Sequence, residues 1–206
     1  MNHFSNILPY ILWIVFFIGS CLMSYYAYTH AIFPIDLSVS SLVMTLENPS
    51  MTSIMNIAST VGTVPGVIIS VCLSAIILGV FYGIRTGLSM LSVFIWDVAN
   101  ELLKFIISRP RPGHLGLTET DSFPSGHVFH SIILLGTIWL HLYPKMTRFQ
   151  RTVLGFASTA VIAIVSLQRI YLDRHWPTDV VGSILIAGII LISISLVIKI
   201  RNKHSS

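Results

Sequence analysis

Three short polar segments, at residues 104–112, 124–127 and 169–179, interrupt an otherwise apolar chain of 206 residues. Together they contain two histidines, two aspartates, of which Asp179 is the one considered below, and several cationic side chains. Histidine titrates near neutral pH and can act as nucleophile, acid or base, while cations can neutralise the oxygens of a transferring phosphoryl group. The three segments therefore predict chemistry on a phosphate ester.

The segment Pro124-Ser125-Gly126-His127 has the composition of a helix N-terminus that binds an anion. Proline suits the first helical position, and small residues leave backbone N–H groups open where the helix dipole attracts negative charge. His127 would lie beside the anion and could protonate a leaving oxygen. An ordinary proline-capped helix start with a polar side chain at the membrane interface explains these four residues equally well on their own.

His175 and Asp179 lie four residues apart across a predicted helix start at Pro177. From the first helical turn, Asp179 can reach back to His175. A carboxylate that holds one imidazole nitrogen fixes the tautomer and leaves the other nitrogen free to attack, so we predict His175 as a nucleophile. The alternative, which is commoner for such a pair alone, makes Asp179 a helix cap and His175 an interface residue.

Cations complete the predicted phosphate site. Lys104, Arg111 and Arg169 are placed to neutralise the phosphoryl oxygens. Lone cations at helix ends often anchor a membrane protein at the level of the lipid headgroups. We interpret Arg109 and Arg174 as such anchors.

An apolar segment before the first motif also contains charge. Asp97, Glu101 and Lys104 recur at spacings of four and three, which places them on one face of a helix. Charge at that depth is costly unless it is paired or functional. We predict that Asp97 and Glu101 keep Lys104 charged, with a purely structural pair as the alternative.

The composition indicates a membrane protein, because 54% of residues are hydrophobic, 10% are charged and the mean hydropathy is +0.82. Soluble domains carry about 25% charged residues. Six segments approach the ~20 apolar residues that cross a bilayer, namely 7–28, 57–82, 86–107, 124–143, 152–168 and 177–198. Segment 33–49 mixes apolar and acidic residues and is typical of a helix lying at the interface. We therefore predict an all-α integral membrane fold, a single domain over 1–206 in which six transmembrane helices form a bundle and 100–180 carries the motifs.

The distribution of cations predicts the orientation, since short cytoplasmic loops collect Lys and Arg. Seven of the twelve cations lie at the helix ends that six alternating spans place on one face: Arg85, Lys145, Arg148, Arg151, Lys199, Arg201 and Lys203. Both termini are therefore expected in the cytoplasm, with the polar segments at the outer face of the plasma membrane. The formal charge of +4 needs no nucleic acid to explain it, and the implied partner is lipid.

Taken together, the polar segments resemble the tripartite signature of the type 2 phosphatidic acid phosphatase family, in its bacterial form. The matching parts are Lys104 followed by six residues and Arg111-Pro112, then Pro124-Ser125-Gly126-His127, then Arg169 followed by five residues, His175, three residues and Asp179. One position departs from the family pattern, because Gln168 stands where serine usually precedes the arginine. An amide at this position can still donate a hydrogen bond to phosphate.

The resemblance implies a metal-independent lipid phosphatase or diphosphatase. His175 would form a phosphohistidine, Asp179 would orient it, and His127 would protonate the leaving group. The phosphoryl oxygens would be held by Lys104, Arg111, Ser125, Gly126 and Arg169. No cofactor is expected, and the remaining histidines show no spacing typical of a metal site.

The motifs recognise a phosphate and say little about the lipid attached to it. By analogy with the family, undecaprenyl diphosphate is favoured, with phosphatidylglycerol phosphate or phosphatidate next. A relative that performs vanadate-dependent oxidation is disfavoured, because the similar haloperoxidases are soluble. A non-enzymatic transporter or channel would explain Asp97, Glu101 and Lys104 but leaves the spacing of the two histidines to coincidence. The oligomeric state is not predicted.

Overall fold

The computed structural model describes residues 3–29, 32–113 and 121–204, and within these residues all regular structure is helical. The elements in chain order are α1 (His3–Tyr28), α2 (Pro34–Met44), α3 (Pro49–Ser59), η1 (Thr60–Gly62), α4 (Val64–Tyr82), α5 (Ile84–Met90), α6 (Ser92–Ile107), α7 (Gly126–Leu142), η3 (Tyr143–Lys145), α8 (Arg148–Tyr171) and α9 (Pro177–His204). The predicted all-α class is confirmed.

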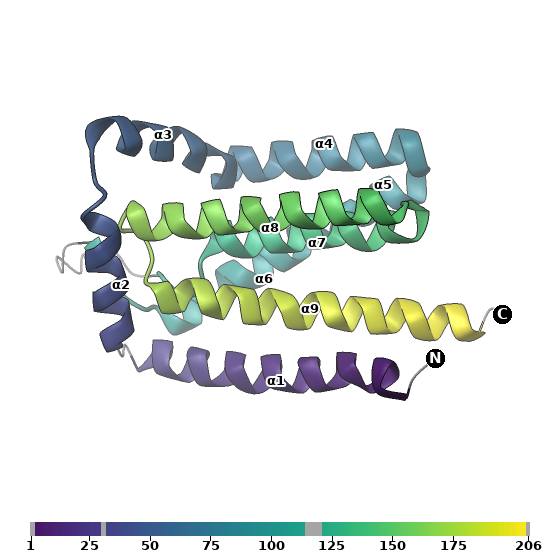
Figure 1. Ribbon diagram of the computed structural model, residues 1–206, viewed down its shortest axis with the longest axis horizontal. Helices are drawn as coiled ribbons and strands as arrows, with labels where there is room; N and C mark the ends of the chain where they lie inside the picture. The colour runs from purple at the N-terminus through teal and green to yellow at the C-terminus, as the bar shows by residue number, and fades with distance from the viewer. Residues whose placement is uncertain (1–2, 30–31, 114–120, 205–206) are drawn as a thin grey trace.

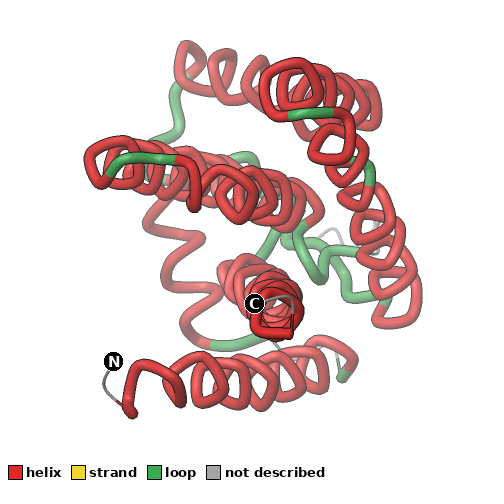
Figure 2. Tube along the Cα trace, turned by 90° about the vertical axis from the view of Figure 1, so that its right-hand side faces the viewer, coloured by secondary structure: helices red, strands yellow, loops and turns green. Residues whose placement is uncertain are grey.

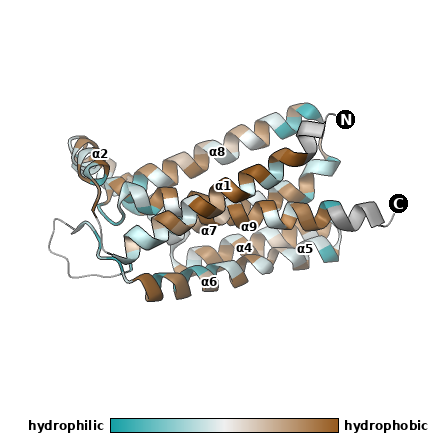
Figure 3. Cartoon of the chain, turned by 90° about the horizontal axis from the view of Figure 1, so that it is seen from below, coloured by the Kyte–Doolittle hydropathy of each residue, from teal (hydrophilic) through white to brown (hydrophobic). Residues whose placement is uncertain are grey.

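Five stretches of these helices are long and apolar enough to cross a membrane. They are Ile7–Tyr28, Val64–Tyr82, Gly126–Lys145, Arg148–Tyr171 and Pro177–Lys199. Hydrophobic residues cover the lengths of the helices, and hydrophilic ones gather toward the two ends of the bundle (Figure 3). The chain is therefore a multi-pass membrane protein, with many large apolar side chains exposed on its outer surface.

The predicted span 86–107 is not one continuous helix, so the count of six spans is not confirmed. It is divided between α5 and α6 at Leu91. The hydroxyls of Ser89 and Ser92 donate to carbonyls three residues earlier, at 2.6 and 2.8 Å. Serine hydroxyls that compete for backbone carbonyls bend helices. The remaining helix, α6, has 16 residues, which span about 24 Å.

Two other predicted boundaries were wrong because local capping signals determine them. The span predicted from residue 57 begins at Val64, after an extended Thr63, and Pro65 lies in its first turn. The span predicted at 152–168 is longer, because Thr147 and Gln150 form a capping box that starts α8 at Arg148.

The arrangement of the helices brings the three polar segments to one end of the bundle. The C-terminal helix α9 lies at the centre (Figure 2) and packs against α1 and α7. The short helix α2 crosses one end and contacts α8 and α9, while both chain termini lie at the other end (Figure 1). Consequently, the last turns of α6 and α8 and the first turns of α7 and α9 meet near α2. The short helix predicted at 33–49 corresponds to α2, which ends earlier than predicted, at Met44.

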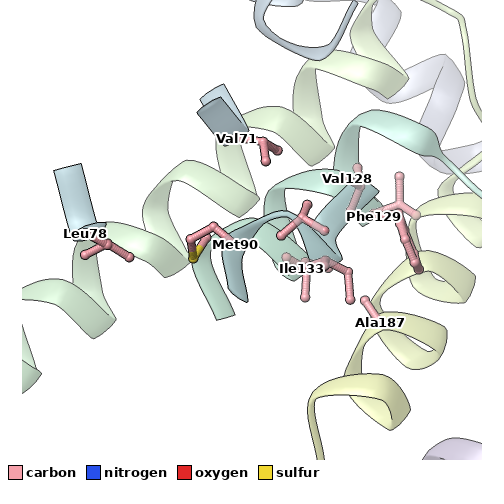
Figure 4. Packing of buried hydrophobic residues seen from close by; sticks show 10 residues of the cluster. Val71, Leu78, Met90, Val128, Phe129, Ile133 and Ala187 are labelled. Carbon is pink, nitrogen blue, oxygen red and sulfur yellow. The ribbon is translucent and has the colours of Figure 1, made fainter. Parts of the chain in front are cut away.

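Apolar side chains fill the space between α4, α5, α6, α7 and α9 (Figure 4). Val71, Met90, Val93, Val128 and Ile133 are fully buried there. Lipid tails are as apolar as these side chains, so close packing rather than hydrophobicity must hold the helices together. Gly87 of α5 allows the closest approach, because a Cβ at this position would lie 2.5 Å from the Ala75 carbonyl oxygen and 2.8 Å from the Gly79 Cα.

We expect Gly87→Ala to destabilise the bundle by about 1–3 kcal/mol, because backbone atoms of α4 must move to admit the methyl group. Gly79→Ala is the matched control, since its Cβ would meet its nearest neighbour, the Gly87 Cα, at an ordinary 3.6 Å. Thermal unfolding in detergent measures both variants. A Gly87→Ala protein as stable as Gly79→Ala would contradict this packing.

Candidate active site

A cavity of about 530 Å³ opens at the junction of the polar segments. Six of the eight predicted site residues line it: Lys104, Arg111, Gly126, His127, Arg169 and His175. Lys104 and Arg169 come from the last turns of α6 and α8, and Gly126 opens α7. Three residues that can carry positive charge and two histidines thus surround one space, as the spacing of the motifs predicted.

The same cavity has an apolar wall built by two helices. Its residues are Val64, Val67 and Ile68 of α4 and Phe94, Val98 and Leu102 of α6. Four of them, including Val98 and Leu102, are also exposed on the outer surface of the bundle. The cavity therefore joins a charged interior to the apolar exterior between α4 and α6.

Ser125 and Asp179, the other two predicted residues, are fully buried and are not among the residues that line the cavity. The Ser125 N–H donates to Ser183 Oγ at 2.7 Å. That backbone donor is therefore engaged within the protein, which differs from the predicted open anion seat. Ser125 Oγ is buried and has no hydrogen-bond partner among the residues that the structure describes.

The imidazole of His175 is held in one tautomer by a backbone carbonyl. Its Nδ1 lies 2.6 Å from the carbonyl oxygen of Ser122. A carbonyl oxygen can only accept, so Nδ1 carries the proton and Nε2 keeps its lone pair. Asp179 Oδ2 lies 3.7 Å from Nδ1, which is an electrostatic contact but too long for a hydrogen bond. The tautomer is thus fixed by the Ser122 carbonyl, whereas the sequence had predicted that the Asp179 carboxylate would fix it.

Burial keeps His175 in the neutral form. The side chain is 2% exposed, and burial lowers the pKa of His175 below its ordinary 6.5, with the charges of Arg111 and Lys104 acting in the same direction. The carboxylate of Asp179 raises the pKa and opposes this shift. A neutral imidazole with a free Nε2 is the form that can act as a nucleophile.

Asp179 is held from two sides. Its Oδ2 accepts from the Trp176 N–H at 2.8 Å, so it caps α9 as well as facing His175. Its Oδ1 accepts from Nη1 of Arg109. Arg109 is 1% exposed, and our interpretation of this residue as a headgroup anchor was therefore wrong. Its place in the run Arg109-Pro110-Arg111-Pro112, directly before a predicted site arginine, is the sequence signal that could have indicated a buried role.

His127 contacts two groups through the same nitrogen. Its Nε2 lies 3.1 Å from the Ser59 carbonyl oxygen and 3.2 Å from Nη1 of Arg169. The carbonyl requires a proton on Nε2, whereas the guanidinium requires a lone pair, so each contact suits a different protonation state. The contact with Ser59, at the end of α3, was not predicted from the sequence. Gly62 in η1 completes the contact, because a Cβ there would lie 2.0 Å from His127 Cδ2.

The acidic residues of α6 have separate partners. Glu101 Oε1 accepts from Lys104 Nζ at 2.8 Å, as predicted. Asp97 does not pair with Lys104, because its Oδ2 lies 2.9 Å from Nδ1 of His130. His130 in turn contacts Ser70 Oγ through Nε2 at 3.0 Å. Asp97 therefore joins α6 to α7 and α4 instead of supporting the cation.

Gln168, the departure from the family pattern, is buried and is not among the cavity lining. Its amide donates to the Met55 carbonyl oxygen at 2.6 Å. The Gln168 amide, which could have donated a hydrogen bond to phosphate, therefore links α8 to α3 instead.

Comparison with known proteins adds independent findings. The family model described as PAP2 superfamily matches residues 83–203. Phosphatidylglycerophosphatase B of Bacillus subtilis (strain 168) is 29% identical over 167 residues, covering 75% of this chain and 79% of that protein. The crystal structure of a transmembrane PAP2 type phosphatidylglycerolphosphate phosphatase from Bacillus subtilis has a similar fold, with TM-score 0.72, 23% identity and coverage of 94% and 96%. Aquifex aeolicus LpxE gives TM-score 0.59 and 22% identity, covering 80% of this chain and 96% of that one.

We expect Gly62→Ala to lower the turnover of phosphate-bearing lipid by about 10²-fold, because the methyl group displaces the His127 ring by an amount comparable to 1 Å. Gly79→Ala, whose methyl group has space, should retain turnover. Phosphate release in detergent micelles measures both. Unchanged turnover in Gly62→Ala would mean that the observed position of His127 is not the one used.

Proposed function

The chain belongs to the PAP2 superfamily, and on that premise we propose that this membrane lipid phosphatase works through a phosphohistidine on His175. The family resemblance drawn from the motifs is thereby confirmed. The observation that carries the proposed mechanism is the 2.6 Å contact of His175 Nδ1 with the Ser122 carbonyl. This contact leaves Nε2 with a lone pair beside three cationic residues of the same cavity.

The proposed reaction has two steps. Nε2 of His175 attacks phosphorus, the bond to the leaving oxygen breaks, and His127 gives that oxygen a proton. Water then attacks the phosphohistidine while His127 takes its proton, which releases inorganic phosphate and restores neutral His175. As Nε2 bonds to phosphorus, the ring gains positive charge, which the nearby carboxylate of Asp179 stabilises.

Five residues are proposed to hold the phosphoryl oxygens: Lys104, Arg111, Arg169, Ser125 and Gly126. Two buried donors support this assignment, because Ser125 Oγ and Arg169 Nε have no hydrogen-bond partner among the described residues. Buried polar groups are normally paired, so unpaired donors beside a cationic cavity fit an anionic ligand. Lys104 and Gly126 lie close together, since a Cβ on Gly126 would be 3.0 Å from Lys104 Nζ.

The substrate is proposed to be a lipid phosphate that enters from the bilayer between α4 and α6. The apolar wall of the cavity suits a lipid tail, and its charged end suits the phosphate. The name of the Bacillus subtilis relative makes phosphatidylglycerol phosphate the first lipid to test, with undecaprenyl diphosphate and phosphatidate as competitors. The transporter alternative is less well supported, because Asp97 is paired with His130 and Glu101 with Lys104 at the cavity wall.

The orientation is proposed from the distribution of cations. The polar segments lie at the end of the bundle opposite to both termini (Figure 1). With the termini in the cytoplasm, as the seven cations at that end favour, the site faces the outer side of the plasma membrane.

We expect His175→Ala to abolish phosphate release and His127→Ala to lower it by about 10²–10⁴-fold, the usual contribution of general acid–base catalysis. Phosphate release from the three lipids in micelles measures turnover, and rapid quenching with radiolabelled substrate measures phosphoenzyme. His141→Ala is the matched control, because this histidine lies at the far end of α7 and contacts Ser89. Retained turnover in His175→Ala would refute the mechanism.

Chelators are expected to leave the wild-type protein active, since Lys104, Arg111 and Arg169 supply the charge that a divalent metal supplies in other phosphoryl-transfer enzymes. Among the described residues, no group of three or more His, Cys, Asp or Glu side chains could hold a metal ion. The measurement is phosphate release before and after treatment with EDTA. Loss of activity with full return on adding a metal would contradict the metal-free mechanism.

A further inference from the structure

Asp36 is a fully buried carboxylate in an otherwise peripheral helix, and the mechanism above does not use it. It belongs to α2, which crosses the end of the bundle (Figure 1), and it is not among the residues that line the catalytic cavity. A buried carboxylate is costly unless donors surround it. The hydrogen-bond partners of Asp36 therefore indicate its structural role.

Among the residues that the structure describes, two of the four donors to Asp36 come from the start of α9. Its Oδ1 accepts from the Thr178 N–H at 2.9 Å, and its Oδ2 accepts from Thr178 Oγ1 at 2.8 Å. Oδ2 also accepts from Nη2 of Arg109 at 3.0 Å and from the Phe33 N–H at 3.3 Å. Only the Phe33 contact belongs to the capping of α2 itself. The other three reach across to the catalytic end of the bundle.

Arg109 connects Asp36 to Asp179. Its Nη2 donates to Asp36, while its Nη1 donates to Asp179 Oδ1 and to Thr178 Oγ1, the latter at 2.9 Å. All four side chains are at least nine-tenths buried. A planar guanidinium shared between two carboxylates has little freedom to rotate. Asp36 thus holds one side of the guanidinium, and the other side of the guanidinium fixes the position of Asp179, which faces His175.

We propose that Asp36 is a positioning residue for the phosphatase reaction, which sets the place of Asp179, and through it His175, by holding Thr178 and Arg109. This inference rests on the proposed role of His175. Asp36 does not touch the cavity, so it acts through the first turn of α9 and not on the substrate. Through this one side chain, α2 helps to position the first turn of α9, and the helix also covers the end of the bundle.

The first test compares Asp36→Asn with Ser40→Ala. The amide places a donor where Arg109, Thr178 and Phe33 also donate, so the contacts cannot all persist. We expect kcat per folded molecule to fall about 10- to 100-fold with KM within about threefold, since a small displacement at the reacting groups has effects of this size. Ser40 is a buried neighbour on α2 whose hydroxyl has no partner among the described residues, and Ser40→Ala should stay within about twofold of wild type in both parameters.

The second test reads the position of His175 without using activity. In protein labelled with ¹⁵N-histidine, the proton on His175 Nδ1 is shared with the Ser122 carbonyl over 2.6 Å and should give a low-field resonance, identified by its absence from His175→Ala. We expect this resonance to move or disappear in Asp36→Asn and to remain in Ser40→Ala. A general loss of stability in folded protein would not move it selectively.

Changes in both kcat and the resonance support the inference, and wild-type behaviour of either one overturns it. If Asp36→Asn does not fold, Thr178→Val replaces it, because this variant removes the hydroxyl between Asp36 and Arg109 and keeps both charges. The same two readings apply. Turnover retained in His175→Ala would overturn the proposed function, whereas an inactive His175→Ala beside an unaffected Asp36→Asn would overturn this inference alone.

Discussion

Charge placed at membrane depth must be paired or stabilised by fixed dipoles, and this constraint accounts for the layout of the site. Four helix ends meet there: the C-terminal turns of α6 and α8 and the N-terminal turns of α7 and α9. Lys104 and Arg169 lie in the C-terminal turns, where the helix dipole favours cations. Asp179 and the proposed phosphate site lie at the N-terminal turns, where it favours anions. The up-and-down topology thus provides both signs of dipole at one end of the bundle.

Within that setting, orienting His175 is divided between two acceptors. The Ser122 carbonyl is neutral and holds the proton on Nδ1, which determines the tautomer. Asp179 lies farther from the ring, where its carboxylate can stabilise the positive charge that the proposed mechanism places on the imidazole. Asp179 also caps α9 and binds Arg109, so one carboxylate has structural and electrostatic tasks that are not separable by sequence pattern.

The sequence predicted the fold class, the membrane location and six of the residues that line the cavity, because apolar periodicity and motif spacing report local geometry. It failed where long-range contacts decide. Asp36 and Thr178 are 142 positions apart, and no local pattern pairs them. Arg109 resembles an interface anchor until the fold buries it between α2 and α9. The division of span 86–107 lies where two serine hydroxyls bond to carbonyls three residues earlier. Asp97 pairs with His130 because α6 packs against α7.

The apolar wall of the cavity, contributed by α4 and α6, has a consequence for how this enzyme meets its substrate. A lipid that arrives between these helices travels in two dimensions, so its encounter rate depends on lateral diffusion within the bilayer. The quantity that determines saturation is then the mole fraction of substrate among the surrounding lipids, and the amount in the aqueous volume is irrelevant. With the proposed entry between α4 and α6, diluting the membrane with inert lipid slows the enzyme, whereas diluting the suspension with buffer does not.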